Sequence, residues 1–265
     1  MPAPKPISKT KPESASVSGH APATLASTVY DRLRSDILTG ELEPGRKLRI
    51  EFLGNRYHTG HSPIREALNR LSSDGLVERR DQRGFLVAAA NTEDLTELTK
   101  ARCWLEGIAL RESIAARTQA WEENVVIAYH RLSRAPRSLS PKVYRENPEW
   151  ESLHRAFHLS LIAGCGSRWL LAFCAQLSDQ SYRYRQIAFQ RAFPLRTNTH
   201  GHQAIMDAAI EGDTDKAVRL LQMHLRFTAD TILKNGAVLN APPSATKRHQ
   251  SKVQAGLRRP TTRRG

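Results

Sequence analysis

The chain has few cysteines and no long apolar run. Its 265 residues include three cysteines, Cys103, Cys165 and Cys174, and no two of them form a CxxC pair. An odd count without such a pair argues against a disulfide framework and is typical of a reducing compartment. No segment approaches the roughly 20 apolar residues of a membrane span, and the N-terminus has no apolar stretch of signal-peptide length. We therefore expect a soluble, cytoplasmic protein with no membrane partner.

Acidic residues are missing from the last thirty positions, which hold seven lysines and arginines. These seven account for half of the formal net charge of +14, so the rest of the chain is only moderately basic. A basic surplus suits a polyanionic partner, because Lys and Arg neutralise phosphates and release condensed counterions, but it does not identify one. The simpler interpretation of residues 236–265 is a solvated, disordered basic tail.

Large apolar side chains are also scarce in residues 1–22, which are rich in Pro, Ser, Ala and Lys. Such a segment cannot bury enough surface to offset its ordering entropy, so we expect it to be disordered. The remaining length allows two domains. The sequence pattern places them at residues 23–90 and 91–235.

The first domain is predicted to begin with three helices. Leu25 starts a helical repeat of apolar residues that ends at Gly40, a residue suited to a left-handed cap. A Pro-Gly turn then precedes a second helix at about 50–57. Ser62 is the predicted N-cap of the third helix, with Pro63 at the first helical position, where the missing N–H costs nothing.

Two short apolar runs then flank a polar bend that ends at Gly84, which predicts a β-hairpin. Three helices followed by a hairpin form a winged helix-turn-helix. Beyond Asn91 the pattern predicts only helices, so the chain is mainly α and its second domain is an all-α antiparallel helical bundle. The helices are expected at about 92–117, 121–134, 149–163, 167–191, 199–211 and 214–234, divided by prolines and glycines.

The third helix is the candidate DNA reader, because the second helix of such a pair enters the major groove with its N-terminal residues nearest the bases. Arg65 can reach a phosphate or a guanine edge, and the hairpin tip can approach the adjacent minor groove. The alternative is that Arg65 is only a solvent-facing helix charge. The candidate DNA-binding residues are His61, Ser62, Pro63, Arg65, Asn69, Arg83 and Gly84.

Three stretches, GELEPGRKL, SPIREALNRLSSDGLVERR and RGFLV, resemble the GntR family of bacterial regulators over about residues 23–89. The match is specific, because the Pro-Gly turn, the Ser-Pro helix and the Arg-Gly hairpin occur in order at the right distances. The resemblance implies binding to a double-stranded DNA operator. The family usually has an Arg just before the Ser-Pro helix, where this chain has His61. A neutral imidazole is a weaker phosphate anchor than a guanidinium, so we expect the affinity or its pH dependence to differ.

The second domain carries four histidines at positions that suit a metal site. His154 and His158 are four residues apart on one predicted helix and therefore share a face. His202 and His224 lie on two later helices, each beside apolar neighbours, so three helices can point four imidazoles at one centre. The alternative is four unconnected histidines, because a pair at this spacing is by itself a weak signal.

Three further stretches, WESLHRAFHLSL, HGHQAIMDAAIEGDTDKAV and LLQMHL, resemble the effector-binding domain of the FadR subfamily, the FCD type, over about residues 92–234. Many members of that subfamily hold a divalent metal through an Asp and three His. The three histidines match His158, His202 and His224, whereas the Asp position falls on His154, which leaves open whether His154 is a ligand. A set of four imidazoles favours Zn or Ni over Mg.

A metal with open coordination positions attracts small carboxylates, and a nearby cation would fix the other end of such a ligand. The resemblance implies that Arg102 and Glu106 point into the cavity; the alternative is an intrahelical ion pair on the surface. The stretch SYRYRQ adds Tyr182, Arg183 and Arg185, of which one or two are expected to face the pocket. The expected effector is a small organic acid.

The leading hypothesis is a homodimeric transcription regulator, a repressor and not an enzyme, which binds a pseudo-palindromic operator and responds to an organic acid. Two alternatives remain. In one, the histidine cluster is the catalytic metal centre of a hydrolase with Glu106 or Glu151 as general base, although no motif such as HExxH supports it. In the other, the metal is structural or is itself the signal.

Overall fold

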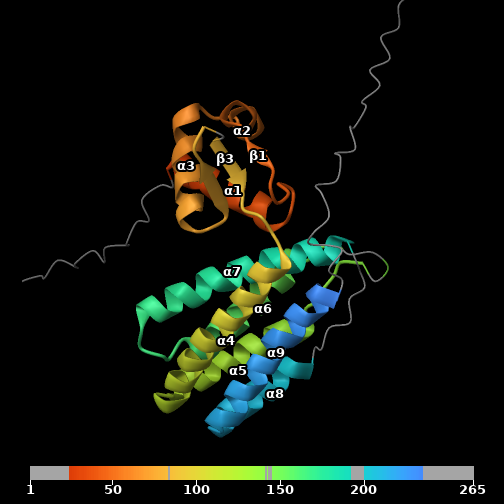
Figure 1. The fold of residues 1–265 in the computed structure, drawn as a ribbon. Helices are drawn as coiled ribbons and strands as arrows, with labels where there is room; N and C mark the ends of the chain where they lie inside the picture. The colour runs from red at the N-terminus through yellow and green to blue at the C-terminus, as the bar shows by residue number, and fades with distance from the viewer. Residues whose placement is uncertain (1–23, 83, 141, 143–144, 192–199, 235–265) are drawn as a thin grey trace, which may run out of the picture.

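The structure, a computed structural model, describes residues 24–82, 84–140, 142, 145–191 and 200–234. It consists of a small unit of helices and a sheet above a larger helical unit (Figure 1). The two terminal segments that were predicted to be disordered, residues 1–22 and 236–265, lie outside the described residues.

The small unit forms because three helices each turn an apolar face to one core. Leu33, Leu53 and Leu68, one from each helix, are completely buried there. A three-stranded antiparallel sheet in the order β1-β3-β2 completes the unit. The predicted winged helix-turn-helix is confirmed. Its elements are α1 (Leu25–Leu38), β1 (Lys47–Leu48), α2 (Ile50–Tyr57), α3 (His61–Ser73), β2 (Val77–Arg80) and β3 (Gly84–Val87).

The start of α3 differs from the prediction. The N-cap is Gly60, without a side-chain cap hydrogen bond, and His61 is the first helical residue. Ser62 is therefore not the N-cap, and Pro63 is the third residue of the helix. This position tolerates proline because the first N–H groups of a helix have no intrahelical partner.

The strand β1 was not predicted either. Lys47 and Leu48 pair with Leu86 and Phe85 of β3. Two residues are too short to show the alternation that identifies a strand, so the pattern indicated only a turn here.

The larger unit is the predicted antiparallel helical bundle, and each helix begins and ends within two residues of its predicted range. Val125, Phe157 and Ile205, from three different helices, are completely buried in its core. Within the described residues no helix is long and apolar enough to cross a bilayer. The helices are α4 (Thr92–Ala115), α5 (Gln119–Arg134), α6 (Pro148–Ile162), α7 (Arg168–Arg191), α8 (His200–Glu211) and α9 (Thr214–Lys234).

The helix α7 lies directly beneath the small unit and joins the two units (Figure 1). Its Asp179 forms an ion pair with Arg34 of α1. The next residue, Gln180, donates a hydrogen bond of 3.0 Å to the carbonyl of Asp74 at the end of α3. Tyr182 packs against the core of the small unit. The helix α7 thus contacts the winged helix-turn-helix and also packs inside the bundle.

Candidate functional site

The exposed face of α3 is the first candidate site. Leu68 and the other apolar residues of the helix are buried against the core, which turns Arg65 and Asn69 toward solvent. At the start of the helix His61 and Ser62 are exposed, whereas Pro63 is half-buried. The predicted reading residues of α3 therefore lie on one accessible surface.

The hairpin and α3 together form a concave surface with a cavity of about 310 Å³. Arg65 and Asn69 line it from α3, and Arg79 and Gly84 line it from the hairpin. Arg79 is exposed and makes no ion pair with any residue that the structure describes. It was missed in the sequence, although two arginines directly before the hairpin bend were a signal.

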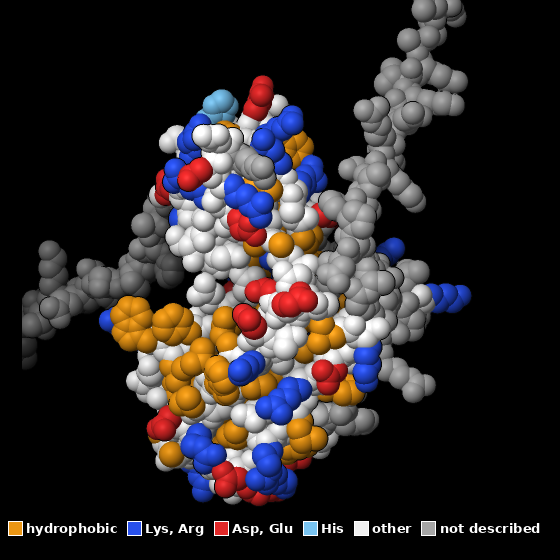
Figure 2. All heavy atoms as spheres, in the orientation of Figure 1, with side chains coloured by type: hydrophobic (Ala, Val, Ile, Leu, Met, Phe, Trp, Pro, Cys, Tyr) orange, Lys and Arg blue, Asp and Glu red, His pale blue; other side chains and the backbone are white. Residues whose placement is uncertain are grey.

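The hairpin tip adds to this surface. Gly84 has φ 78°, a left-handed conformation that the bend requires and that glycine adopts without strain. The predicted contact residue Arg83 lies outside the described residues. Figure 2 shows Lys and Arg side chains over the hairpin and beside α3, with a few Asp and Glu side chains among them. A surface of this sign suits the phosphates of a nucleic acid.

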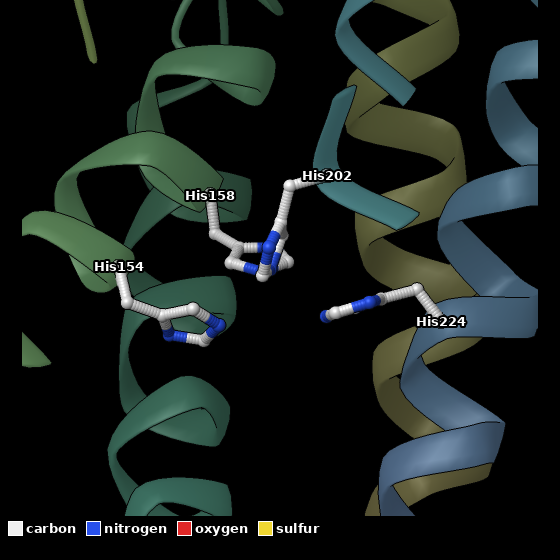
Figure 3. A group of neighbouring side chains, drawn as sticks. All are labelled: His154, His158, His202 and His224. Carbon is white, nitrogen blue, oxygen red and sulfur yellow. The ribbon is translucent and has the colours of Figure 1, made fainter. Parts of the chain in front are cut away.

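The second candidate site is the group of four histidines in the bundle. His154 and His158 come from α6, His202 from α8 and His224 from α9, and their rings converge (Figure 3). Each offers one ring nitrogen, and these four nitrogens all lie within 4.8 Å of one another. The structure thus brings together all four histidines that were expected from the sequence to share a centre.

Burial keeps these imidazoles neutral. His154, His158 and His202 are buried, and His224 is partly buried. Burial lowers the pKa of His202 to about 4, with further lowering from nearby arginines. Burial and the neighbouring imidazoles hold the pKa of His154, His158 and His224 well below the ordinary value. Near pH 7 each ring therefore has an unprotonated nitrogen available to a cation.

The donor set fits a metal ion. Both ring nitrogens of His158 and Nε2 of His202 are buried without a hydrogen-bond partner among the described residues. Unpaired buried polar atoms cost free energy, and an ion would give the lone pairs of these rings a partner. Two nitrogens on one tetrahedral zinc ion lie roughly 3.4 Å apart, so the rings, whose nitrogens lie within 4.8 Å of one another, would draw together around the ion.

Two buried ion pairs flank the histidines. Arg102 and Glu106 of α4 pair at 2.7 Å, and Arg185 of α7 pairs with Glu151 of α6 at 2.8 Å. The side chains of Arg102 and Glu106 are only 7% and 4% exposed, so this pair is not the wet surface pair that the sequence left open. Burial is the largest cause of the lowered pKa of His158, and the neighbouring imidazoles come next. The charges of Arg102 and Arg185 lower this pKa further, so both guanidinium groups lie near the cluster.

The other two candidates of the SYRYRQ stretch point elsewhere. Tyr182 donates a hydrogen bond to Glu146 and lines a cavity beside the cluster. Arg183 donates to the carbonyls of Ala88 and Ala89, at the end of the small unit. Successive helix residues are rotated by about 100°, so Arg183 and Arg185 face different sides of α7. Arg183 therefore lies away from the histidines, and Arg185 is the arginine of this stretch that lies beside them.

The structure adds Trp150 to the site. Its ring stacks on that of His154 with centroids 4.7 Å apart and planes inclined by 19°. The guanidinium carbon of Arg137 lies 4.9 Å from the centroid of the same indole. An aromatic residue one helical turn before a candidate ligand was a signal in the sequence, because residues four apart on a helix are neighbours.

Comparison with known proteins assigns one family model to the small unit and another to the helical bundle. The family model described as "Bacterial regulatory proteins, gntR family" matches residues 25–87, and that of the FCD domain matches residues 97–227. The HTH-type transcriptional regulator BphR of Paraburkholderia xenovorans (strain LB400) is 36% identical over 80% of this chain and 87% of its own length. The chain belongs to the GntR family.

A second relative and two solved structures agree with this assignment. The HTH-type transcriptional repressor GlaR of Escherichia coli (strain K12) is 34% identical over 74% of this chain and 90% of its own length. Two solved structures share the fold. E. coli McbR/YncC has a TM-score of 0.65 and 19% sequence identity, and the match covers 80% of this chain and 98% of that one. A putative transcriptional regulator GntR from Rhodococcus sp. RHA1 has a TM-score of 0.62 and 21% identity, with coverage of 79% of this chain and 97% of that one. GntR-family regulators bind DNA operators, so this chain is a DNA-binding transcription regulator. FCD domains often bind metals, which agrees with the histidine cluster.

Proposed function

We propose that this regulator is a repressor whose operator affinity is controlled by a small carboxylate bound at a divalent metal in the bundle. The convergence of four neutral imidazoles beside two buried arginines carries this proposal. One of the relatives is named a repressor, which supports the sign of the regulation.

The four histidines would hold the ion. Four nitrogen donors without a carboxylate favour Zn or Ni over Mg, which prefers oxygen ligands. A bound ion supplies positive charge and open coordination positions for a carboxylate. Arg102 and Arg185, the buried guanidinium groups beside the cluster, donate hydrogen bonds to the ligand oxygens that lie away from the ion. Burial of the site excludes water and strengthens these contacts.

The effector acts by shifting an equilibrium between arrangements of the two units, which requires that it binds one arrangement more tightly. The helix α7 supports this route, because it carries Arg185 at the histidine cluster and Asp179 at α1. A homodimer completes the proposal, since two copies of α3 on a two-fold axis match a pseudo-palindromic operator.

A hydrolase finds less support in the geometry. A catalytic metal centre needs a free general base within reach of the substrate. Glu106 and Glu151, the acids considered for this role, both accept charge-assisted hydrogen bonds from arginines. Neither carboxylate is free to act as a base in this arrangement.

The metal site is tested with His202→Ala in the full-length protein. We expect the purified wild type to bind one Zn²⁺ per chain and to gain thermal stability on loading, because an ion that binds only the folded state stabilises it. His202→Ala should lose most of the bound zinc and most of this gain. Elemental analysis and thermal shift measure the two quantities.

His130 on α5 is exposed and lies outside the cluster, so His130→Ala is the matched control and should bind zinc like the wild type. Equal zinc content in His202→Ala and wild type would contradict the proposed site. A panel of small carboxylates added to the zinc-loaded protein then separates a ligand-responsive site from a structural metal, since only the first is stabilised further by an acid.

A further inference from the structure

The linker between the two units is held from both sides. It passes from β3 into α4 beside α7 and consists of alanines, which have no polar side chain (Figure 1). The N–H of Ala88 donates at 3.0 Å to the carbonyl of Leu76 in the small unit. The N–H of Ala89 donates at 3.3 Å to Oε1 of Glu78 in the same unit. The carbonyls of both alanines instead accept from Arg183 of α7, so the linker joins the two units through its backbone.

Arg183 is a buried cation without a counter-charge in contact. It is 1% exposed and forms no ion pair with any residue that the structure describes. Its Nε has no hydrogen-bond partner among the described residues, and burial lowers its pKa. The two linker carbonyls are therefore its acceptors. The linker cannot move away from Arg183 without leaving a buried charge unpaired, which is costly.

The next residue of α7 holds the start of α4. Tyr184 is completely buried, and its hydroxyl donates a hydrogen bond to Asp94 in the first turn of α4. The same hydroxyl accepts from the backbone N–H of Asn91 at 3.4 Å. Two consecutive residues of α7 thus contact the junction at residues 88–94.

The ion pair that also joins the two units is less buried. Its members Arg34 and Asp179 are 29% and 18% exposed, and ion pairs that reach water contribute little to holding a structure in place. A cavity of about 770 Å³ lies beside the linker, lined by Gly75 of the small unit and Leu98 of the bundle, so packing is incomplete on that side. Among the charged contacts between the units that the structure describes, that of Arg183 is the most buried.

We infer that Arg183 is a positioning residue for operator binding, which fixes the winged helix-turn-helix on the bundle and so sets the separation of the two reading helices in the dimer. This inference rests on the homodimer of the proposed function, and neither the metal nor an effector enters it. With the linker held, two copies of α3 meet DNA at one separation. Half-sites at another separation require deformed DNA or leave one reading helix unbound. The junction thereby selects the spacing of the operator, while α3 selects its bases.

The test uses the full-length protein and duplexes that carry a half-site selected from random DNA, either once or twice. The separation of the two copies changes one base pair at a time over one helical turn, roughly 10 base pairs. Fluorescence anisotropy at fixed salt measures the affinities. We expect the wild type to bind the best separation about tenfold or more tightly than the worst, because a wrong separation costs DNA deformation. Arg183→Met should reduce this ratio to about threefold or less, since the loosened units adapt to several separations. It should bind the single half-site like the wild type.

Three further variants sharpen the test. Arg183→Lys keeps a charged donor for the linker carbonyls and should retain most of the spacing preference. Tyr184→Phe removes only a hydroxyl and should lower the preference in the same direction as Arg183→Met. Arg131→Met, at an exposed arginine of α5, should match the wild type. Binding to the single half-site reports on the fold of the small unit, and circular dichroism and analytical ultracentrifugation report on the bundle and the dimer.

An undiminished spacing preference in Arg183→Met would overturn the inference. An equal loss of affinity for one and two half-sites would overturn it too, because Arg183 would then act on the fold of the reading unit and not on its placement. If Arg183→Met does not fold, an unchanged preference in Tyr184→Phe overturns the inference instead. If the wild type binds one and two half-sites equally at every separation, the homodimer of the proposed function is wrong and this inference falls with it.

Discussion

Arg65 is the residue on which we expect DNA reading to depend most directly. It is exposed on α3, and it lines the concave surface between that helix and the hairpin. We expect Arg65→Ala to weaken binding to the operator by about 1 to 3 kcal/mol, because a guanidinium there contacts a base edge or a positioning phosphate. Gel shift or fluorescence anisotropy at fixed salt measures the change, with DNA from the protein's own promoter region.

Arg131→Ala is the control for that experiment, since Arg131 is an exposed arginine on α5 of the bundle. It changes the net charge by the same amount and should leave operator binding almost unchanged. An operator affinity that is unaltered in Arg65→Ala would exclude Arg65 as a reader and shift attention to Arg79 on the hairpin.

Individual side chains were predictable from the sequence where helix periodicity alone sets their direction. His154 and His158 share a face because they are four residues apart, and the apolar neighbours of His202 fix its face in the same way. The surroundings of Arg183 were not predictable, because α7 is buried on several sides and both Arg183 and Arg185 are buried. Arg183 donates to backbone carbonyls and Arg185 pairs with a carboxylate, and this difference depends on the elements that pack against α7.

The ends of the helices are the places where a single side chain most clearly determines where an element begins. Asn91 caps α4: its Oδ1 accepts a hydrogen bond of 2.7 Å from the backbone N–H of Asp94. Glu93 and Asp94 add negative charge to the first turn, where the helix dipole favours it. This helix leads from the winged helix-turn-helix into the bundle, so its start sets the junction between the two.

We expect Asn91→Ala to lower the free energy of unfolding by about 1 kcal/mol, because one backbone N–H at the start of α4 loses its partner. Asn91→Asp keeps an acceptor at the same place and should have nearly wild-type stability. Denaturant unfolding followed by circular dichroism measures both values. Equal losses in the two variants would show that Asn91 acts through something other than the cap.

The long helices were predictable because prolines and glycines mark their ends and apolar residues repeat along them. Gly40 and Gly75, with φ of 82° and 73°, show why such punctuation works, since few other residues adopt that conformation without strain. The strand β1 and the N-cap of α3 were missed, because a two-residue strand depends on its partner β3 and a glycine cap leaves no side-chain signal.

The arrangement of the two units lies beyond what local patterns contain. Asp179 and Gln180 of α7 contact α1 and the end of α3 across the boundary between the two units. These contacts join residues more than 100 positions apart in the chain. Periodicity within one helix predicts which face is buried, but not which other element buries it.

An apolar face on the bundle is the candidate surface for the proposed homodimer. Arg111 of α4 pairs with Asp215 of α9, and Cys103 lies against Gln222, so the two helices run antiparallel. Their outer sides therefore form one surface, on which Trp104 is 58% exposed. The other large apolar side chains exposed on these two helices are Ile108 (53%), Met223 (64%) and Phe227 (44%). Monomeric soluble proteins rarely leave so many large apolar side chains together in water, and hydrophobic side chains are prominent on the bundle in Figure 2.

We expect Ile108→Glu to convert the protein to a monomer, because a carboxylate buried at a two-fold interface meets its own copy and has no partner. Operator affinity should fall with it, since one winged helix-turn-helix reads only half of a pseudo-palindrome. Analytical ultracentrifugation measures the mass, and gel shift with one and two half-sites measures the binding. Val126→Glu, at an exposed apolar residue of α5, is the matched control and should remain dimeric. A dimer that persists in Ile108→Glu at micromolar concentration would place the interface on another face of the molecule, whereas a monomer with an unchanged circular dichroism spectrum would assign it to α4 and α9.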